Sequence, residues 1–358
     1  MSKHIVALGG DGVGPEVTDV AVDILVAMNL GFEIFNPPCG EFAIQKYGTV
    51  LPDETKKLCL DADAVLFGAA DRKSAPVLVF LRWEMDNYVN IRPIKYYPGA
   101  ATPLKDAEGI DFVILRENSE GLYPWGKEGD IARLAEKWPE WKDRTLGKRF
   151  QDYGKGKFAI RIITERGVSR VAKFACEYTQ KRKRLGYPGK LTCVTKSNVL
   201  QESCGLFQNL TEAEIKKYPD LIYEHFYIDD MSRRILRYPK EMDVALTSNM
   251  FGDILSDEAS ELVGGLGIAA SACIGGKTPY FEPVHGSAPK YANQNVINPT
   301  AMILSAKMML EYFEMEAEAK ALETAVAEVY REGKHLTRDQ GGCATTTDFK
   351  NAVLAKLR

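Results

Sequence analysis

Two aspartates four residues apart carry the clearest chemical pattern in this chain of 358 residues. Asp253 and Asp257 lie in the stretch 252–265, directly after a short run, 246–251, that reads as the end of a strand. On a helix this spacing places both carboxylates on one face, about one turn apart. Mg²⁺ and Mn²⁺ take such oxygen ligands, and α/β proteins bind ligands at strand ends. We therefore expect a divalent metal site here; a solvated helix face is the alternative.

Three arginines form a second pattern. Arg92 and Arg116 each follow an apolar segment, and Arg82 falls on the helix expected at about 76–85. A planar guanidinium group can bind two carboxylate oxygens in parallel. One isolated arginine is most often a solvated surface charge. Three arginines beside apolar segments predict a site for a small polyanionic substrate.

The composition is that of an ordinary soluble globular protein, with 45% hydrophobic and 27% charged residues. A net charge of -3 gives no reason to expect a nucleic-acid or membrane partner. No apolar run approaches the roughly 18 residues of a membrane span, and the start of the chain reads as a short strand, not a signal peptide. Seven cysteines without a CxxC pair indicate reduced thiols, so we expect a cytoplasmic protein.

Strand and helix signals alternate along the chain, which predicts the α/β fold class. Strands are expected at 4–8 and 64–69, and a helix at 16–28. The glycine loop after the first strand is not the dinucleotide fingerprint, because Pro15 stands where the last glycine is required. The length allows two domains or one large doubly wound unit.

Seven motifs in order make the chain resemble the β-decarboxylating dehydrogenases, the family of isocitrate, 3-isopropylmalate, homoisocitrate and tartrate/D-malate dehydrogenases. They occupy 10–16, 82–93, 116–123, 195–200, 227–231, 252–259 and 282–289. The resemblance spans nearly the whole chain and implies an isopropylmalate dehydrogenase-like fold, with two domains sharing a large mixed sheet. The implied domains are a discontinuous cofactor-side domain, 1–97 and 265–358, and a dimerisation and metal/substrate domain, 98–264. Trp125 and a long arm insert near 127–157 depart from the family pattern.

The resemblance also implies roles for single residues. Arg82, Arg92 and Arg116 would hold the carboxylates of a malate-like substrate, a hydroxy-dicarboxylate. The implied metal ligands and proton-transfer pair are Asp253, Asp257, Asp229 of the partner subunit, Tyr123 and the partner's Lys196. The protein would then be a homodimer with shared active sites. Asp230 is a second candidate ligand, but the register of Asp229 with Met231 matches the family motif.

For the cofactor, the resemblance places the adenosine half of NAD or NADP against the segment that follows position 285. The implied contacts are His285, Gly286, Ser287, Ala288, Lys290, Tyr291, Asn298 and Arg338. NAD-using members carry an aspartate where this chain has Lys290, and NADP-using isocitrate dehydrogenases have the same Lys-Tyr pair. Gly341 and Gly342 stand where a further arginine would be expected. We therefore favour NADP over NAD.

By the resemblance, substrate choice depends on the residues before Arg82, because family members place there the side chains that contact the substituent on C3 of the substrate. Isocitrate dehydrogenases place a serine and an asparagine there, whereas this chain has the apolar run 75–79 with Leu78 and Val79. Burying an unpaired carboxylate costs several kcal/mol, while burying a methylene gains about 0.8 kcal/mol.

The sequence therefore predicts metal-dependent oxidative decarboxylation of a 3-substituted D-malate with hydride transfer to NAD(P). The leading substrate is 3-isopropylmalate, with tartrate, D-malate and isocitrate as alternatives. A non-catalytic regulatory subunit is the alternative class. Retention of the arginines, the aspartates, Tyr123 and Lys196 favours the enzyme.

Overall fold

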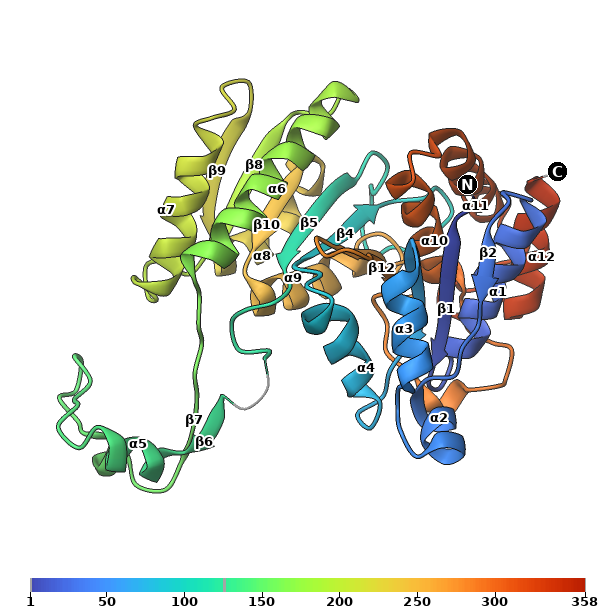
Figure 1. The fold of residues 1–358 in the computed structure, drawn as a ribbon. Helices are drawn as coiled ribbons and strands as arrows, with labels where there is room; N and C mark the ends of the chain where they lie inside the picture. Colours follow the sequence, from blue (N-terminus) through green and yellow to red (C-terminus); the bar gives the residue numbers. More distant parts are fainter. Residues whose placement is uncertain (1, 125–126, 358) are drawn as a thin grey trace.

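One mixed β-sheet runs through the whole molecule (Figure 1). The structure is a computed structural model and describes residues 2–124 and 127–357. Along the sheet the strand order is β2-β1-β3-β12-β11-β4-β5-β10-β8-β9. The pairs β12/β11, β11/β4 and β4/β5 are antiparallel, and the other neighbours are parallel. The strand bounds are β1 (His4–Gly10), β2 (Glu33–Phe35), β3 (Ala64–Ala69), β4 (Val89–Lys95), β5 (Asp111–Glu117), β8 (Lys190–Thr195), β9 (Ile222–Tyr227), β10 (Val244–Thr247), β11 (Ala270–Ile274) and β12 (Tyr280–Pro283).

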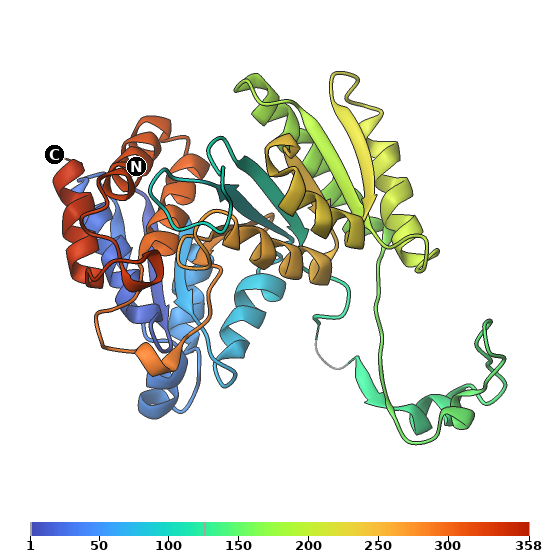
Figure 2. The same ribbon diagram turned by 180° about the vertical axis from the view of Figure 1, so that it is seen from behind.

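Helices cover both faces of the sheet. Figure 2, which views the molecule from behind, shows α8 and α9 in front of the strands, whereas α6 lies on the side seen in Figure 1. The helix bounds are α1 (Gly14–Ala27), α2 (Gly40–Tyr47), α3 (Asp53–Asp61), α4 (Ala75–Val79), α6 (Glu165–Arg184), α7 (Ser203–Ile215), α8 (Ile228–Arg237), α9 (Asn249–Glu261), α10 (Thr300–Tyr312), α11 (Glu316–Glu332) and α12 (Thr346–Lys356). Within the described ranges, no helix is both long and apolar enough to span a membrane. Each of the seven cysteines is a free thiol, as the sequence predicted.

The alternation of side chains along β5 assigns its two faces. Val113 and Leu115 join the apolar cluster shared with α6 and α10, and Phe112 and Ile114 join the cluster shared with α8 and α9. Successive residues of a strand point to opposite faces, so Arg116 falls on the same face as Ile114. This face carries α9.

The sheet has two parts, and their strands belong to different regions of the sequence. Strands from the first 95 residues and from 270–283 make one part, and strands from 111–247 make the other. Both chain ends lie beside the first part (Figure 1). This order is compatible with the expected discontinuous domain; the boundaries at 97 and 265 remain predictions.

The arm segment projects away from the sheet (Figure 1). It consists of β6 (Glu128–Asp130), α5 (Ile131–Lys137) and β7 (Lys157–Ala159), and β6 pairs antiparallel with β7. Trp138 and Trp141 are exposed, although the ring of Trp141 stacks on Phe150 with centroids 4.2 Å apart. Trp125, singled out in the sequence, lies outside the described residues.

Candidate active site

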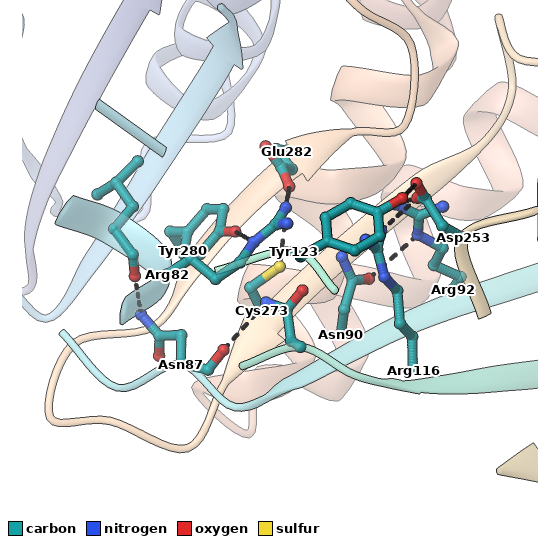
Figure 3. Close-up of polar contacts among 12 residues, drawn as sticks. Arg82, Asn87, Asn90, Arg92, Arg116, Tyr123, Asp253, Cys273, Tyr280 and Glu282 are labelled. Carbon is teal, nitrogen blue, oxygen red and sulfur yellow. Dashed lines mark hydrogen bonds and ion pairs between the residues drawn. The ribbon is translucent and has the colours of Figure 1, made fainter. Parts of the chain in front are cut away.

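The three arginines meet on the α9 face of the sheet (Figure 3). Arg92 pairs with Ile114 and Arg116 pairs with Asn90 across β4 and β5, which makes the two arginines diagonal neighbours on one face. Arg82 comes from a π-helical turn (Phe80–Glu84) that continues α4. The three side chains are buried, with exposed fractions of 8%, 5% and 1% for Arg82, Arg92 and Arg116.

Arg92 follows an apolar segment in the sequence, but it does not end a strand. Arg92 lies inside β4, which continues to Lys95 because it pairs antiparallel with β5 along its whole length. Its guanidinium group reaches the α9 face because alternate residues of a strand share a face.

Helix α9 brings the aspartates to the arginines. It packs closely on β5 because Gly252 has no side chain, and a Cβ there would lie 2.7 Å from the Cβ of Arg116. Asp253 forms ion pairs with Arg116 and with Arg92, the latter at 3.1 Å. Asp257, one turn later, lies 3.4 Å from Arg92. The four-residue spacing therefore places both carboxylates on one face of α9, beside the arginine cluster.

Burial and the neighbouring charges shift the pKa values of the groups in this cluster. Burial, followed by repulsion from Arg92 and Arg82, lowers the pKa of Arg116 to about 10. Burial alone would raise the pKa of Asp253, but attraction by Arg116 and Arg92 lowers it overall. The pKa of Asp257 is raised because burial outweighs the pull of Arg92. An added anion would relieve the repulsion among the arginines.

Tyr123 completes the cluster from the segment after β5 (Figure 3). Its hydroxyl donates a hydrogen bond to Asp253, and the guanidinium of Arg116 lies 4.8 Å from the centre of its ring. Burial, and then the bond to Asp253, raises the pKa of Tyr123 to about 12. The phenol is therefore protonated at neutral pH and can act as a proton donor.

Residues without an assigned role hold the arginines in place. The amide oxygen of Asn249 accepts hydrogen bonds from Nε and Nη2 of Arg116, at 3.1 and 2.8 Å. Tyr280 and Glu282 contact Arg82, at 3.4 Å from Nε and 3.7 Å from Nη2. Glu282 could have been noticed as an acid within an otherwise apolar strand. Asn249 carries no comparable signal in the sequence.

The donor set of α9 suits a hard divalent cation. Asp253 and Asp257 present carboxylate oxygens, and the Asp257 side chain is 52% exposed. Within the described residues of one chain, no three acidic, histidine or cysteine side chains form a metal cluster, so Asp229 does not join the two aspartates. Asp229 instead pairs with Lys196 of its own chain. Asp230 pairs with two arginines of its own helix.

The segment after β12 packs against the glycine loop that follows β1. The backbone N–H of Val13 donates to the carbonyl of Ser287 at 2.9 Å. Gly12 has a φ of +58°, and a Cβ there would overlap that carbonyl oxygen. This contact explains the glycine without invoking a nucleotide. Ala288 adopts a left-handed conformation, with a φ of 36°.

Several expected cofactor contacts lie on the surface of this segment. His285 has a buried Nε2 atom without a hydrogen-bond partner among the described residues, and a Cβ on Gly286 would meet nothing within 4 Å. The ammonium of Lys290 lies 4.7 Å from the ring centre of Tyr291, and both side chains are exposed. Arg338 is also exposed. Nδ1 of His285 donates to the carbonyl of Gly286 at 3.0 Å, which leaves Nε2 as a free acceptor among the described residues. A free acceptor and exposed cations beside open space suit an anionic dinucleotide.

Asn298 has a different environment. It is buried, and its amide donates to Tyr330 at 3.1 Å and to Asp339 at 2.9 Å. Its oxygen accepts from the backbone of Thr300 at 3.0 Å. The side chain is thus committed to internal bonds that fix the segment before α10.

Leu78 and Val79 lie just before Arg82, on α4. Both are half-buried. Leu78 packs on the apolar cluster that contains Val77 and Phe80, and Val79 borders a cavity of 130 Å³. The surface before the arginine is therefore apolar in the fold as well as in the sequence.

Comparison with known proteins gives a consistent set of similarities. The family described as "Isocitrate/isopropylmalate dehydrogenase" matches residues 4–353. The chain is 41% identical over 355 residues to a 3-isopropylmalate dehydrogenase of Archaeoglobus fulgidus, covering 99% of each chain. It is 42% identical over 354 residues to a 3-isopropylmalate/3-methylmalate dehydrogenase of Methanocaldococcus jannaschii, covering 99% of this chain and 98% of that one. The solved isocitrate dehydrogenase of Methylococcus capsulatus superposes with a TM-score of 0.86 at 32% identity, and the match covers 100% of each chain.

Proposed function

The chain belongs to the isocitrate/isopropylmalate dehydrogenase family, and from this premise we propose that it catalyses oxidative decarboxylation of a 3-substituted D-malate. One observation carries the proposal: buried Arg92 and Arg116 both pair with Asp253, to which the hydroxyl of Tyr123 also donates a hydrogen bond. Arg82, which is buried as well, lies in the same cluster (Figure 3). A dicarboxylate suits this cluster, because each guanidinium group can bind two carboxylate oxygens in parallel.

In the proposed mechanism, the three arginines orient the substrate. Arg82, Arg92 and Arg116 grip the substrate carboxylates and hold the hydroxyl-bearing carbon against the cofactor side of the site. When bound, the nicotinamide accepts a hydride and the divalent ion polarises the new carbonyl group, which favours loss of the neighbouring carboxylate. Asp253 and Asp257 would hold that ion.

Proton transfers fall to Tyr123 and Lys196. Tyr123 holds a proton at its hydroxyl oxygen and can deliver it to the carbon that has lost its carboxylate. Lys196 takes the substrate hydroxyl proton in this scheme. Lys196 is bonded to Asp229 of its own chain, so the two residues form one unit that a second copy would offer to this site.

A homodimer is therefore part of the proposal. Asp229 and Lys196 complete the site only if a partner subunit supplies them. The projecting arm, with Trp138 and Trp141 exposed, gives such a partner an apolar surface to cover. The cytoplasmic location expected from the sequence stays a prediction.

The cofactor assignment is a nicotinamide dinucleotide, with NADP favoured. Lys290 and Arg338 are exposed cations beside the expected adenosine site, and Tyr291 backs the lysine. Exposed cations can pair with a 2′-phosphate, which an aspartate at the same position would repel.

For the substrate, 3-isopropylmalate is favoured. Leu78 and Val79, half-buried apolar side chains about one turn before Arg82, would face the C3 substituent in this proposal. Two relatives also carry 3-isopropylmalate in their names. The likeness to an isocitrate dehydrogenase keeps isocitrate as the second candidate, with tartrate and D-malate as further alternatives.

The decisive experiment is a steady-state assay of the purified protein with Mg²⁺ and each nicotinamide. Reduction of the nicotinamide with 3-isopropylmalate in preference to isocitrate is expected, and Leu78→Ser should shift the preference toward isocitrate. A higher kcat/KM for isocitrate in the parent protein would overturn the substrate assignment. No turnover with any 3-substituted malate would favour the non-catalytic alternative.

A further inference from the structure

A second cleft lies behind the arginine cluster, between α6 and α10. It has a volume of 460 Å³. Its floor includes Ile91 and Val113, which alternate along β4 and β5 with the residues of the arginine face. Most of the cleft therefore lies on the face of the sheet opposite the arginines, and Ser260, near the end of α9, also lines it. In Figure 1, α6 lies to the left of β4 and β5 and α10 lies to their right.

Aromatic side chains make up much of the lining. Tyr178 and Phe174 line it from α6, with ring centroids 6.0 Å apart, and Tyr312 and Phe281 line it from the other side, 6.1 Å apart. Met308 of α10 also lines the cleft. Flat aromatic surfaces beside a thioether favour a flat apolar ligand.

The charges around this cleft select against anions. Acids outnumber bases in the lining, which contains Asp111, Glu177, Glu311, Glu316 and Glu323 against Lys95, Lys181, Arg182 and Lys307. Each of those bases already forms an ion pair, at 2.9 Å for Lys95–Glu323, 3.4 Å for Lys181–Glu316, 3.3 Å for Arg182–Asp111 and 2.7 Å for Lys307–Glu311. An anionic ligand would have to break one of these pairs, whereas a neutral one would not.

The half-buried hydroxyl of Tyr178 in the lining remains available to a ligand. No hydrogen bond links the hydroxyl of Tyr178 to any group in 2–124 or 127–357, and the side chain is half-buried against the apolar cluster that α6 shares with the sheet. A half-buried hydroxyl without a partner gains from a ligand that can bond to it.

We propose that this cleft is a binding site for a neutral aromatic molecule of one or two rings that carries a single hydroxyl or amide group. The rings pack between Tyr178 and Met308, and the polar group bonds to the Tyr178 hydroxyl. A volume of 460 Å³ falls within the range of small-molecule pockets. The proposal is independent of the reaction proposed for the opposite face.

Fluorescence titration with 2-naphthol, which is neutral at neutral pH, tests the site on the full chain. Saturable binding to the parent is expected, while 2-naphthalenesulfonate, with the same rings and a negative charge, does not bind. Met308→Trp fills the cleft and abolishes naphthol binding. Tyr178→Phe keeps the ring and weakens binding roughly three- to tenfold, because one hydrogen bond is lost.

Tyr218→Phe is the matched control, since Tyr218 is a half-buried tyrosine outside the cleft. It should leave naphthol affinity unchanged. Equal binding of the sulfonate, or unchanged affinity in Tyr178→Phe, would overturn the proposal. So would a naphthol Kd that rises in proportion to the concentration of 3-isopropylmalate, because this would place naphthol in the arginine cluster.

Discussion

Asn249→Ala should lower kcat/KM, although it changes none of the side chains proposed to contact the substrate or the metal ion. The substitution removes the acceptor of two Arg116 hydrogen bonds, at 3.1 and 2.8 Å. A hydrogen bond to a charged group contributes about 1.5–3 kcal/mol. Arg116 keeps its ion pair with Asp253, so we count the loss as one such bond, about 2–3 kcal/mol. With about 1.4 kcal/mol for each tenfold change, kcat/KM should fall roughly 30- to 150-fold.

The assay is steady-state reduction of the nicotinamide with 3-isopropylmalate. Asn249→Asp restores an acceptor for Arg116 and should recover most of the lost activity, which a purely structural role would not predict. Asn249 is fully buried, so the alanine variant could also lose stability. Thermal unfolding of both variants measures that loss separately from the loss of Arg116 positioning. If Asn249→Ala keeps the parental kcat/KM, the positioning role of Asn249 is refuted.

Three further predictions follow from the site and its surroundings. Asp253→Asn should weaken Mg²⁺ or Mn²⁺ binding, measured by calorimetry, and abolish turnover while leaving the fold intact; full activity of this variant in excess EDTA would contradict the metal assignment. Lys290→Asp should lower kcat/KM for NADP more than for NAD, and an unchanged ratio would reject the phosphate contact. Burial alone would raise the pKa of Glu323, but the ammonium groups of Lys307 and Lys95 lower it overall. The ionised Glu323 therefore stabilises the fold above pH 4.5, the ordinary pKa of a glutamate, and this stabilisation is lost as the pH falls below that value. The urea midpoints of the parent and of Glu323→Gln should differ at neutral pH and converge below pH 4.5.

The local parts of the site were predictable from the sequence. The four-residue spacing of Asp253 and Asp257 predicted one helix face, and α9 confirms it. The apolar run 64–69 predicted a buried strand, which is β3. Such patterns depend on helix and strand periodicity alone, so one sequence is enough to read them.

The remaining parts depend on contacts between distant segments. The position of Arg92 inside β4 follows from pairing with β5, which local pattern does not reveal. The role of Asn249 depends on Arg116, which lies on another element of the fold. The glycine at position 12 is required by the carbonyl of Ser287, far along the chain. Lys196 and Asp229 stay predictions, because their proposed site needs a second copy of the chain.

The order of strands in the sheet also determines when the sheet can be completed during synthesis. Strands β3 and β4 are close in sequence, but β12 and β11 lie between them in the sheet. About 190 residues separate the end of β4 at Lys95 from the end of β12 at Pro283. At about 5–20 residues per second, a ribosome needs roughly 10–40 seconds to make them. Throughout that interval the apolar edge of β3 has no partner on that side, so the nascent chain exposes a strand edge that chaperones must shield from other chains.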